Sequence, residues 1–332
     1  MHKYFTLSHD CYRYLTGLVL LVSLLMFSVS ATAKPNRYAL LVGVSNYPNL
    51  DKNLQLDGPK HDVQLMESVL IEKGFPTDNI ISLSENTGHT RPNRNAITGA
   101  FDRVLLQLEE GDFLFLMMAG HGSRQPAKQT DNDEPDGYDE IFLPSDANKW
   151  NDYIGSVENA ITDDEIGAFV DAVRSKGTDM WVVFDSCHSG TMTRGFSDDS
   201  VRYRKVSESA LGIPTNIEIN KVPGANTIEQ APWIAATSIN AAAVRSRGGA
   251  SSSGNTNSRL GDLTVFSAAQ SYETTPEMRL PRGADNARYH GLFTFSLINE
   301  LSSNKPLNYR QLAQNIVARY SVLPWRNTHP FF

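Results

Sequence analysis

The chain has 332 residues, of which 40% are hydrophobic and 20% charged, as in an ordinary globular protein. This balance excludes a wholly disordered chain, a collagen and a coiled coil. The formal net charge of −7 argues against non-specific nucleic-acid binding, which requires clustered lysine and arginine. Only Cys11 and Cys187 are cysteines, which excludes a disulfide framework.

The first segment is predicted to be a targeting sequence. An apolar run covers 15–29, basic residues precede it, and Ala31-Thr-Ala33 supplies the small residues of a signal-peptidase site. The run is shorter than the roughly 20 residues of a membrane span, so an uncleaved anchor is the less favoured alternative. We expect 1–33 to be a signal peptide and 34–332 to be one periplasmic or secreted domain, with no stable membrane span after cleavage.

Apolar runs alternate with amphipathic patterns along the rest of the chain. Runs typical of buried strands lie at 38–44, 79–83, 112–119, 179–185 and 263–268. Helical periodicity predicts helices at 61–73, 97–108, 162–173, 292–301 and 309–320. This alternation predicts an α/β fold, a mostly parallel sheet with helices on both faces. The pattern is weak over 196–227, and the Gly/Ser-rich stretch 245–261 is expected to be a mobile loop.

Two predicted strands end in residues that could carry chemistry. The first is followed by Gly120-His121-Gly122, and the second ends in Asp185-Ser-Cys187-His188. In open parallel sheets, functional groups gather at the carboxyl ends of strands, so His121 and Cys187 meet if these strands are neighbours.

An imidazole in reach of a thiol can accept its proton and later protonate a leaving amine. The amides of Gly122 and Cys187 would then form an oxyanion hole. The rival base is His188, but adjacent side chains on a continuing strand point to opposite faces, which favours His121. Taken alone, Cys187 is more often a small buried hydrophobe.

These residues resemble those of the metacaspases, the caspase-like cysteine peptidases whose bacterial members are also called orthocaspases. The similarity lies in the segments 38–47, 120–122, 136–140, 161–165 and 185–190, and it extends from 37 to about 194. It is weaker beyond, although 265–270 and 291–295 look like the strand and helix of the family's small subunit. The resemblance implies a caspase-type fold, a His121/Cys187 dyad and a hydrolase.

The resemblance also implies cleavage after Arg or Lys, through an acidic pocket at the positions of Asp62 and Asp185. A pair of carboxylates can hold a guanidinium by charge-assisted hydrogen bonds. The Gln-Ala-Cys-x-Gly signature of animal caspases is absent, so their preference for Asp is not expected. The alternatives are that Asp62 stabilises the first turn of a helix and that Asp185 makes a structural hydrogen bond.

No cofactor is expected for the chemistry, but the resemblance implies Ca²⁺ binding through Asp139, Asp163 and Asp164. The family's fourth aspartate is Arg194 here, which would weaken binding unless Asp198 or Asp199 substitutes. The acidic run 131–140 fails the EF-hand spacing because Pro135 occupies a ligand position. The alternative for the pair at 163–164 is helix capping, with Thr162 and Glu165 as a capping box.

The leading hypothesis is an exported cysteine endopeptidase acting on proteins or peptides with a basic residue before the cleaved bond. Self-processing is expected in the basic loop, at Arg245, Arg247 or Arg259, or at Lys205. One alternative is a transpeptidase or ligase that uses the same dyad. Another is a non-enzymatic caspase-like binding module, which predicts a lost His or Cys, whereas both are present.

Overall fold

A five-stranded parallel sheet forms the centre of the computed structural model, with strand order β11-β9-β3-β1-β2. The strands are β1 (Arg37–Gly43), β2 (Ile80–Leu83), β3 (Phe113–Ala119), β9 (Asp179–Asp185) and β11 (Leu263–Ser267). All five lie where the apolar runs predicted them, within one residue at each end. The structure describes residues 35–127, 137–187, 201–215, 259–269, 273–303, 305–321, 328–330 and 332.

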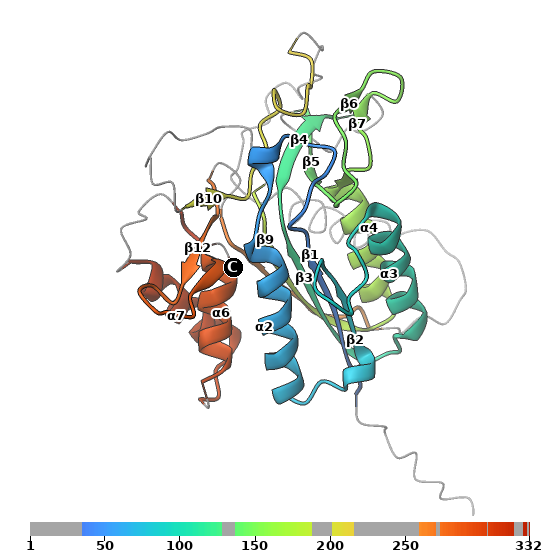
Figure 1. Ribbon diagram of the computed structural model, residues 1–332. Coiled ribbons are helices and arrows are strands. Elements are labelled where there is room, and N and C mark those ends of the chain that lie inside the picture. Colours follow the sequence, from blue (N-terminus) through green and yellow to red (C-terminus); the bar gives the residue numbers. More distant parts are fainter. Residues whose placement is uncertain are drawn as a thin grey trace, which may run out of the picture. The chain divides into compact units, whose positions relative to one another are not determined.

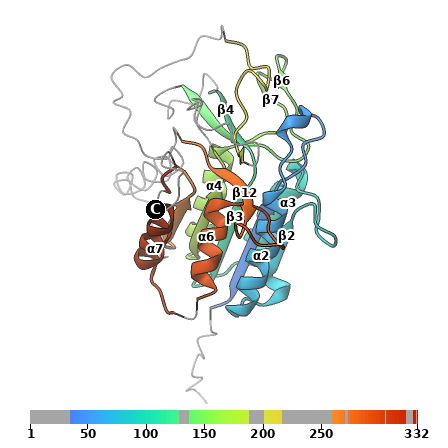
Figure 2. The ribbon, with the colours of Figure 1, turned by 60° about the vertical axis from the view of Figure 1, so that its left-hand side comes forward.

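Helices cover both faces of this sheet, as predicted (Figures 1 and 2). One face carries α2 (Gly58–Glu72), α6 (Leu292–Leu301) and α7 (Tyr309–Ser321), and the other carries α3 (Arg94–Gln107) and α4 (Asp163–Ser175). Short 3₁₀ turns, η1 (Lys52–Leu54) and η2 (Thr77–Asn79), flank α2.

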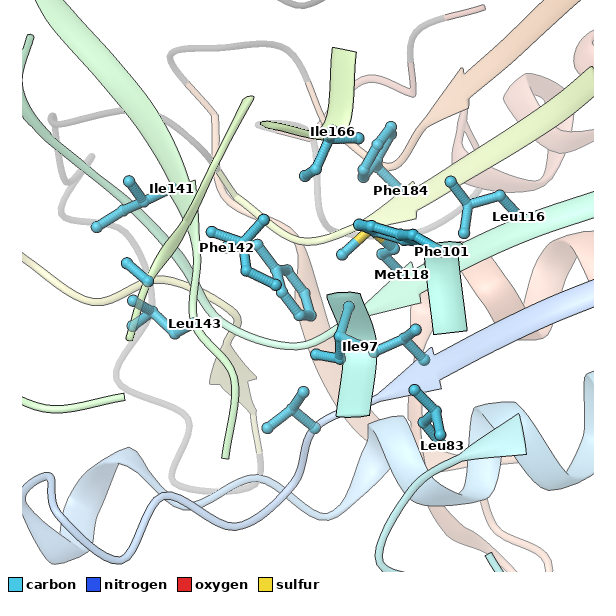
Figure 3. Packing of buried hydrophobic residues seen from close by; sticks show 14 of the residues in the cluster. Leu83, Ile97, Phe101, Leu116, Met118, Ile141, Phe142, Leu143, Ile166 and Phe184 are labelled. Carbon is cyan, nitrogen blue, oxygen red and sulfur yellow. The ribbon is translucent and has the colours of Figure 1, made fainter. Parts of the chain in front are cut away.

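The strands supply both cores because successive side chains point to opposite faces. In β3, Leu114, Leu116 and Met118 pack toward α3 and α4, and the residues between them pack toward α2, α6 and α7. Figure 3 shows the first core, where Phe101, Leu116 and Met118 meet. Burial on both faces explains why these strands are continuous apolar runs.

Three small antiparallel sheets were not predicted. They are β4 (Gly122–Pro126) with β5 (Tyr138–Phe142) and β8 (Ile161–Thr162); β6 (Trp150–Asn151) with β7 (Ser156–Val157); and β10 (Arg202–Tyr203) with β12 (Pro276–Leu280) and β13 (Arg288–Gly291). Their strands are two to five residues long and rich in polar residues, so they have no apolar run to reveal them.

Among the described residues, none of the helices has the length and hydropathy required to cross a bilayer. The predicted signal peptide, His188, and nearly all of the Gly/Ser-rich loop lie outside the described residues.

Candidate active site

The two strands that end in the predicted dyad are direct neighbours. β3 pairs with β9 in parallel, and Ala119 at the end of β3 lies opposite Asp185 at the end of β9. His121 and Cys187 each follow these positions by two residues, so both lie at the same edge of the sheet. Both side chains are buried. The condition under which the sequence analysis brings His121 and Cys187 together, that these two strands are neighbours, is therefore met.

His121 is held in one orientation by its neighbours. Its Nε2 lies 2.8 Å from the carbonyl oxygen of Leu54, and its main-chain N–H donates to the Tyr47 hydroxyl at 2.8 Å. The Tyr47 hydroxyl in turn donates to the carbonyl of Val44. A carbonyl only accepts, so Nε2 of the neutral ring carries the proton and Nδ1 carries the lone pair. Nδ1 is buried without a hydrogen-bond partner among the described residues and is therefore the nitrogen available as a base.

Burial keeps both members of the pair neutral. Desolvation lowers the pKa of His121 to about 4, although the Leu54 carbonyl opposes this shift. Desolvation raises the pKa of Cys187 to about 12, and the N–H that Thr275 donates to Sγ at 2.7 Å only partly offsets it. The resting pair is a thiol and an unprotonated imidazole, so the proton must move as the sulfur attacks.

Asp62 in α2 and Asp185 at the end of β9 converge on one guanidinium. Both carboxylates are fully buried, and so is Arg204, which follows β10. Arg204 donates from Nη2 to Asp62 Oδ2, and its Nη1 lies 3.1 Å from Asp185 Oδ2. The chain's own arginine thus occupies the position at which the sequence predicts a pocket for a basic side chain.

The alternative that Asp62 stabilises the first turn of a helix is wrong, because α2 begins at Gly58 and has no acidic residue in its first turn. Asp62 also accepts from His290 Nδ1 at 3.0 Å and from the N–H of Gly291 at 3.1 Å. The alternative for Asp185, a structural hydrogen bond, is present in addition to its contact with Arg204. Its carboxylate accepts from the hydroxyls of Thr275 and Thr294 at 3.1 and 2.6 Å.

A third carboxylate, Glu277 in β12, was missed by the sequence analysis. It is fully buried, with Oε2 3.6 Å from Arg204 Nη2. The first amides of α2 hold it, since the N–H groups of Asp57 and Gly58 donate to it at 3.0 and 3.1 Å. Gly58 is required here, because a Cβ would lie 2.6 Å from Glu277 Oε2 and 2.7 Å from Arg204 Nη2. No signal in the sequence singles out one glutamate in an unpredicted strand.

These buried charges depend on one another. Burial raises the pKa of Asp185 and of Glu277, while Arg204 opposes both shifts. For Asp62 the Arg204 guanidinium and His290 outweigh burial and lower the pKa. Removing the cation would leave three buried carboxylates uncompensated, which is strongly unfavourable. The pocket therefore requires a long cationic side chain.

The main chain around Arg204 is also held at the dyad. Its carbonyl oxygen accepts from the N–H groups of Gly122 and Cys187, both at 3.2 Å, which are the two amides predicted to form an oxyanion hole. Its N–H donates to the carbonyl of Thr275 at 3.0 Å, and the N–H of Val206 donates to the carbonyl of Gly122 at 3.0 Å. Together with the β10–β12 pairing, these contacts hold residues 202–206 as an extended peptide across the site.

Comparison with known proteins identifies the family. Residues 37–194 match the family model "Metacaspase, peptidase C14 domain". This segment, just under half of the chain, is therefore assigned to the metacaspase family. It is similar to metacaspase-1 of Mycosarcoma maydis, with 33% identity over 157 residues that cover 47% of this chain and 36% of the relative. Metacaspase-1 of Candida albicans is 26% identical over 316 residues, covering 88% of this chain and 65% of the relative.

The chain thus spans between about a third and two thirds of the length of these metacaspases. The fold is also shared with the crystal structure of a Geobacter sulfurreducens protein, with a TM-score of 0.56 and 22% sequence identity over 90% of this chain and 92% of that one. This likeness supports the caspase-like α/β fold.

Asp139, Asp163 and Asp164, which the metacaspase resemblance assigns to Ca²⁺, lie close enough to interact. Asp163 and Asp164 also belong to the first turn of α4. Burial, together with the nearby carboxylates of Asp164 and Asp139, raises the pKa of Asp163 to about 8. Oδ1 of Asp163 is buried without a hydrogen-bond partner in the described part of the chain. The capping box of Thr162 and Glu165 is present at the start of α4, as the alternative predicted.

Within the described residues, no group of three or more His, Cys, Asp or Glu side chains is arranged to hold a metal ion. Arg194, Asp198, Asp199 and the acidic run 131–136 lie outside the described residues.

Proposed function

We propose that this metacaspase-family chain is a cysteine endopeptidase that cleaves after arginine or lysine. The observation that supports this function is the position of Arg204. Its guanidinium forms ion pairs with Asp62 and Asp185, and its carbonyl oxygen accepts hydrogen bonds from the N–H groups of Gly122 and Cys187. A peptide bound for cleavage needs both features at once, a recognised side chain and a polarised carbonyl. Here P1 denotes the residue whose carbonyl is attacked.

The proposed chemistry uses the neutral dyad. Nδ1 of His121 takes the thiol proton of Cys187 as Sγ attacks the P1 carbonyl carbon, and the two amides stabilise the developing oxyanion. The Leu54 carbonyl accepts from Nε2 and stabilises the imidazolium that forms. The imidazolium then protonates the leaving amine as the C–N bond breaks, which leaves a thioester on Cys187. Water, deprotonated by His121, hydrolyses the thioester and releases the new carboxyl terminus.

The buried carboxylates explain why P1 should be basic. Asp62, Asp185 and Glu277 surround the P1 side chain, and the Arg204 guanidinium pairs with all three. A P1 aspartate would add a fourth carboxylate to this pocket, where like charges repel strongly at low dielectric constant. Arginine is favoured over lysine because its planar guanidinium donates to two carboxylates at once.

We further propose that the chain cleaves itself between Arg204 and Lys205. This bond lies one residue before the one expected from the sequence at Lys205. Lys205 is itself buried, and its Nζ is without a hydrogen-bond partner in the described part of the chain. In the Gly/Ser-rich loop, Arg245 and Arg247 lie outside the described residues, whereas Arg259 pairs with Asp179 at 2.7 Å.

The function is tested with fluorogenic peptides that carry Arg, Lys, Asp or Asn at P1. We expect turnover of the Arg and Lys peptides only, and its loss in Cys187→Ala and His121→Ala. Asp102→Asn, which removes an exposed carboxylate of α3, serves as the folded control. Preferential cleavage of the Asp peptide would overturn the assignment. An added peptide amine that appears in the products would indicate acyl transfer beside hydrolysis.

Two further features follow from the sequence expectations. Although the described side chains are not arranged as a metal site, we propose that Ca²⁺ binds at Asp139, Asp163 and Asp164. The unpartnered Oδ1 of Asp163 and the mutual repulsion of these carboxylates support this proposal. Ca²⁺ should then raise the melting temperature of the wild type but not of Asp163→Ala. We also propose export with cleavage near Ala33, which the amino-terminal sequence of the protein recovered from the periplasm or medium would test.

A further inference from the structure

We propose that Thr328 and His329 position the hydrogen-bond donor of the active-site sulfur, the N–H of Thr275. They do so by anchoring residues 273–274, which lead into this donor. The inference rests on the proposed peptidase function and deepens it. It assigns a part in the chemistry to a segment that lies outside the family match at 37–194.

Thr275 directly precedes β12 and is fully buried at the dyad. Its N–H donates to Cys187 Sγ at 2.7 Å, and its hydroxyl donates to Asp185 Oδ1 at 3.1 Å. An N–H group that faces the sulfur lowers the pKa of the Cys187 thiol, because it favours the thiolate over the thiol. The Thr275 N–H therefore stabilises the charge that develops on sulfur as the proton leaves for His121.

Two residues that follow α7 hold the loop before Thr275. The Thr328 hydroxyl donates to the carbonyl of Thr274 at 2.9 Å. The main-chain N–H of His329 donates to Glu273 Oε2 at 2.6 Å, and its ring Nδ1 contacts the other carboxylate oxygen, Oε1. These contacts join residues 54 and 56 positions apart in the sequence. Together they fix the two residues immediately before the donor.

Burial of the anchored groups makes this attachment firm. Glu273 and Thr328 are only 5% and 6% exposed. A buried carboxylate requires hydrogen-bond donors, and both oxygens of Glu273 face donors of His329. Farther along, the Phe332 ring packs edge-on against Phe266 of β11, with ring centres 4.6 Å apart. The segment is thus attached both at the loop and at the core.

Loss of an anchor should weaken the chemistry but not peptide binding. In the described part of the chain, the side chains of Thr328 and His329 bond to the loop. If the Thr275 N–H moves away from Sγ, the developing thiolate loses one hydrogen bond. The loss of one net hydrogen bond corresponds to roughly a fivefold lower rate. We therefore expect an effect on kcat and none on KM.

The test uses pairs of variants that differ in the anchoring group. Thr328→Val removes the hydroxyl but keeps the branched shape, whereas Thr328→Ser keeps the hydroxyl. His329→Ala removes the ring donor, whereas His329→Asn places an amide nitrogen near the position of Nδ1. Arg319→Gln is the control, because it breaks an ion pair of 2.6 Å with Glu300, which links α7 to α6.

The measurements are kcat and KM for a peptide with Arg at P1, the rate at which iodoacetamide alkylates Cys187, and the melting temperature. Mass spectrometry locates the label, because Cys11 is a second thiol. We expect kcat and the alkylation rate to fall roughly fivefold in Thr328→Val and His329→Ala, with KM unchanged. Thr328→Ser, His329→Asn and Arg319→Gln should retain the kcat and alkylation rate of the wild type.

Unchanged kcat and alkylation in Thr328→Val and His329→Ala would overturn the inference. So would an equal loss in Arg319→Gln or in the two conservative variants, which would show a general loss of stability instead of positioning. A rise in KM alone would show an effect on peptide binding and would also contradict it. If the wild type cleaves no peptide but alkylation responds as expected, the proposed function fails and the positioning role stands.

Discussion

Burial shifts the pKa values of His121 and Cys187 far from those of an exposed imidazole and thiol. The pKa of the imidazole is lowered to about 4 and that of the thiol is raised to about 12, in both cases chiefly by burial. Both shifts disfavour the charged form, so this dyad does not rest as a thiolate–imidazolium pair. Cys187 is therefore an unreactive thiol while residues 202–206 cover the site. It becomes a nucleophile only when its proton moves to His121.

The low pKa of His121 predicts a dependence of stability on pH. The unfolded chain binds a proton at this histidine near pH 6.5, whereas the folded chain does so only near pH 4. The stability due to the neutral ring is thus fully present above pH 6.5 and is lost as the pH falls toward 4. The free energy of unfolding should decrease over this window by up to about 3 kcal/mol more than in His121→Gln. Denaturant titrations at pH 7 and pH 4.5 would measure the difference.

Equal pH dependence in the two proteins would contradict this assignment. Asp62 also has a lowered pKa, so its contribution to the free energy of unfolding falls in acid. This contribution is present in both proteins and cancels in the comparison.

At the scale of elements, the central sheet and its helices could be predicted, but the peptide that occupies the site could not. Buried parallel strands are read from continuous apolar runs, and amphipathic helices from their period. β10 is two residues long and lies in a stretch with no clear pattern. Its role comes from tertiary contacts with β12 and with the Gly122 end of β4, which a sequence does not display.

The same contrast holds for the residues of the site. His121, Cys187, Asp62 and Asp185 were found because they lie in or beside predicted elements and match a family pattern. Arg204 and Glu277 lie in or beside strands that were not predicted, so nothing indicated that they would meet at a buried cluster.

The contact between Val206 and Gly122 offers a test at the element scale. Val206→Pro removes the N–H that donates to the Gly122 carbonyl at 3.0 Å, whereas Val206→Ala keeps it. We expect Val206→Pro to slow self-cleavage at least several-fold and to lower the free energy of unfolding by about 1 kcal/mol beyond Val206→Ala. Time courses on denaturing gels and denaturant unfolding would measure both. Self-cleavage in the proline variant at the rate of the alanine variant would indicate that the segment needs no pairing with Gly122.

At the scale of the whole molecule, the proposed cut separates pieces that share one sheet and one core. β11, α6 and α7 lie after Lys205, and β11 pairs with β9 over five residues. Phe266 and Phe293 pack in the same core as Val183, which lies before the cut. The pieces are therefore joined by a domain interior, which buries far more apolar surface than a transient contact.

We accordingly expect the self-cleaved protein to give two bands on a denaturing gel but to elute as one species of unchanged size in native size-exclusion chromatography. The Cys187→Ala protein should give one band and the same native elution volume. Separate elution of the two pieces would show that the sheet does not hold them together.

The central claim is that Arg204 is seated as the residue before the cleaved bond, and intact-mass spectrometry of the purified protein tests it most directly. After incubation with and without Ca²⁺, wild-type protein should yield one fragment that ends at Arg204 and one that begins at Lys205. The Cys187→Ala and Arg204→Ala proteins should remain whole at this bond, and Asp102→Asn should be cut like the wild type. Active enzyme that remains intact at Arg204–Lys205, or that is cut there equally well in Arg204→Ala, would contradict the account.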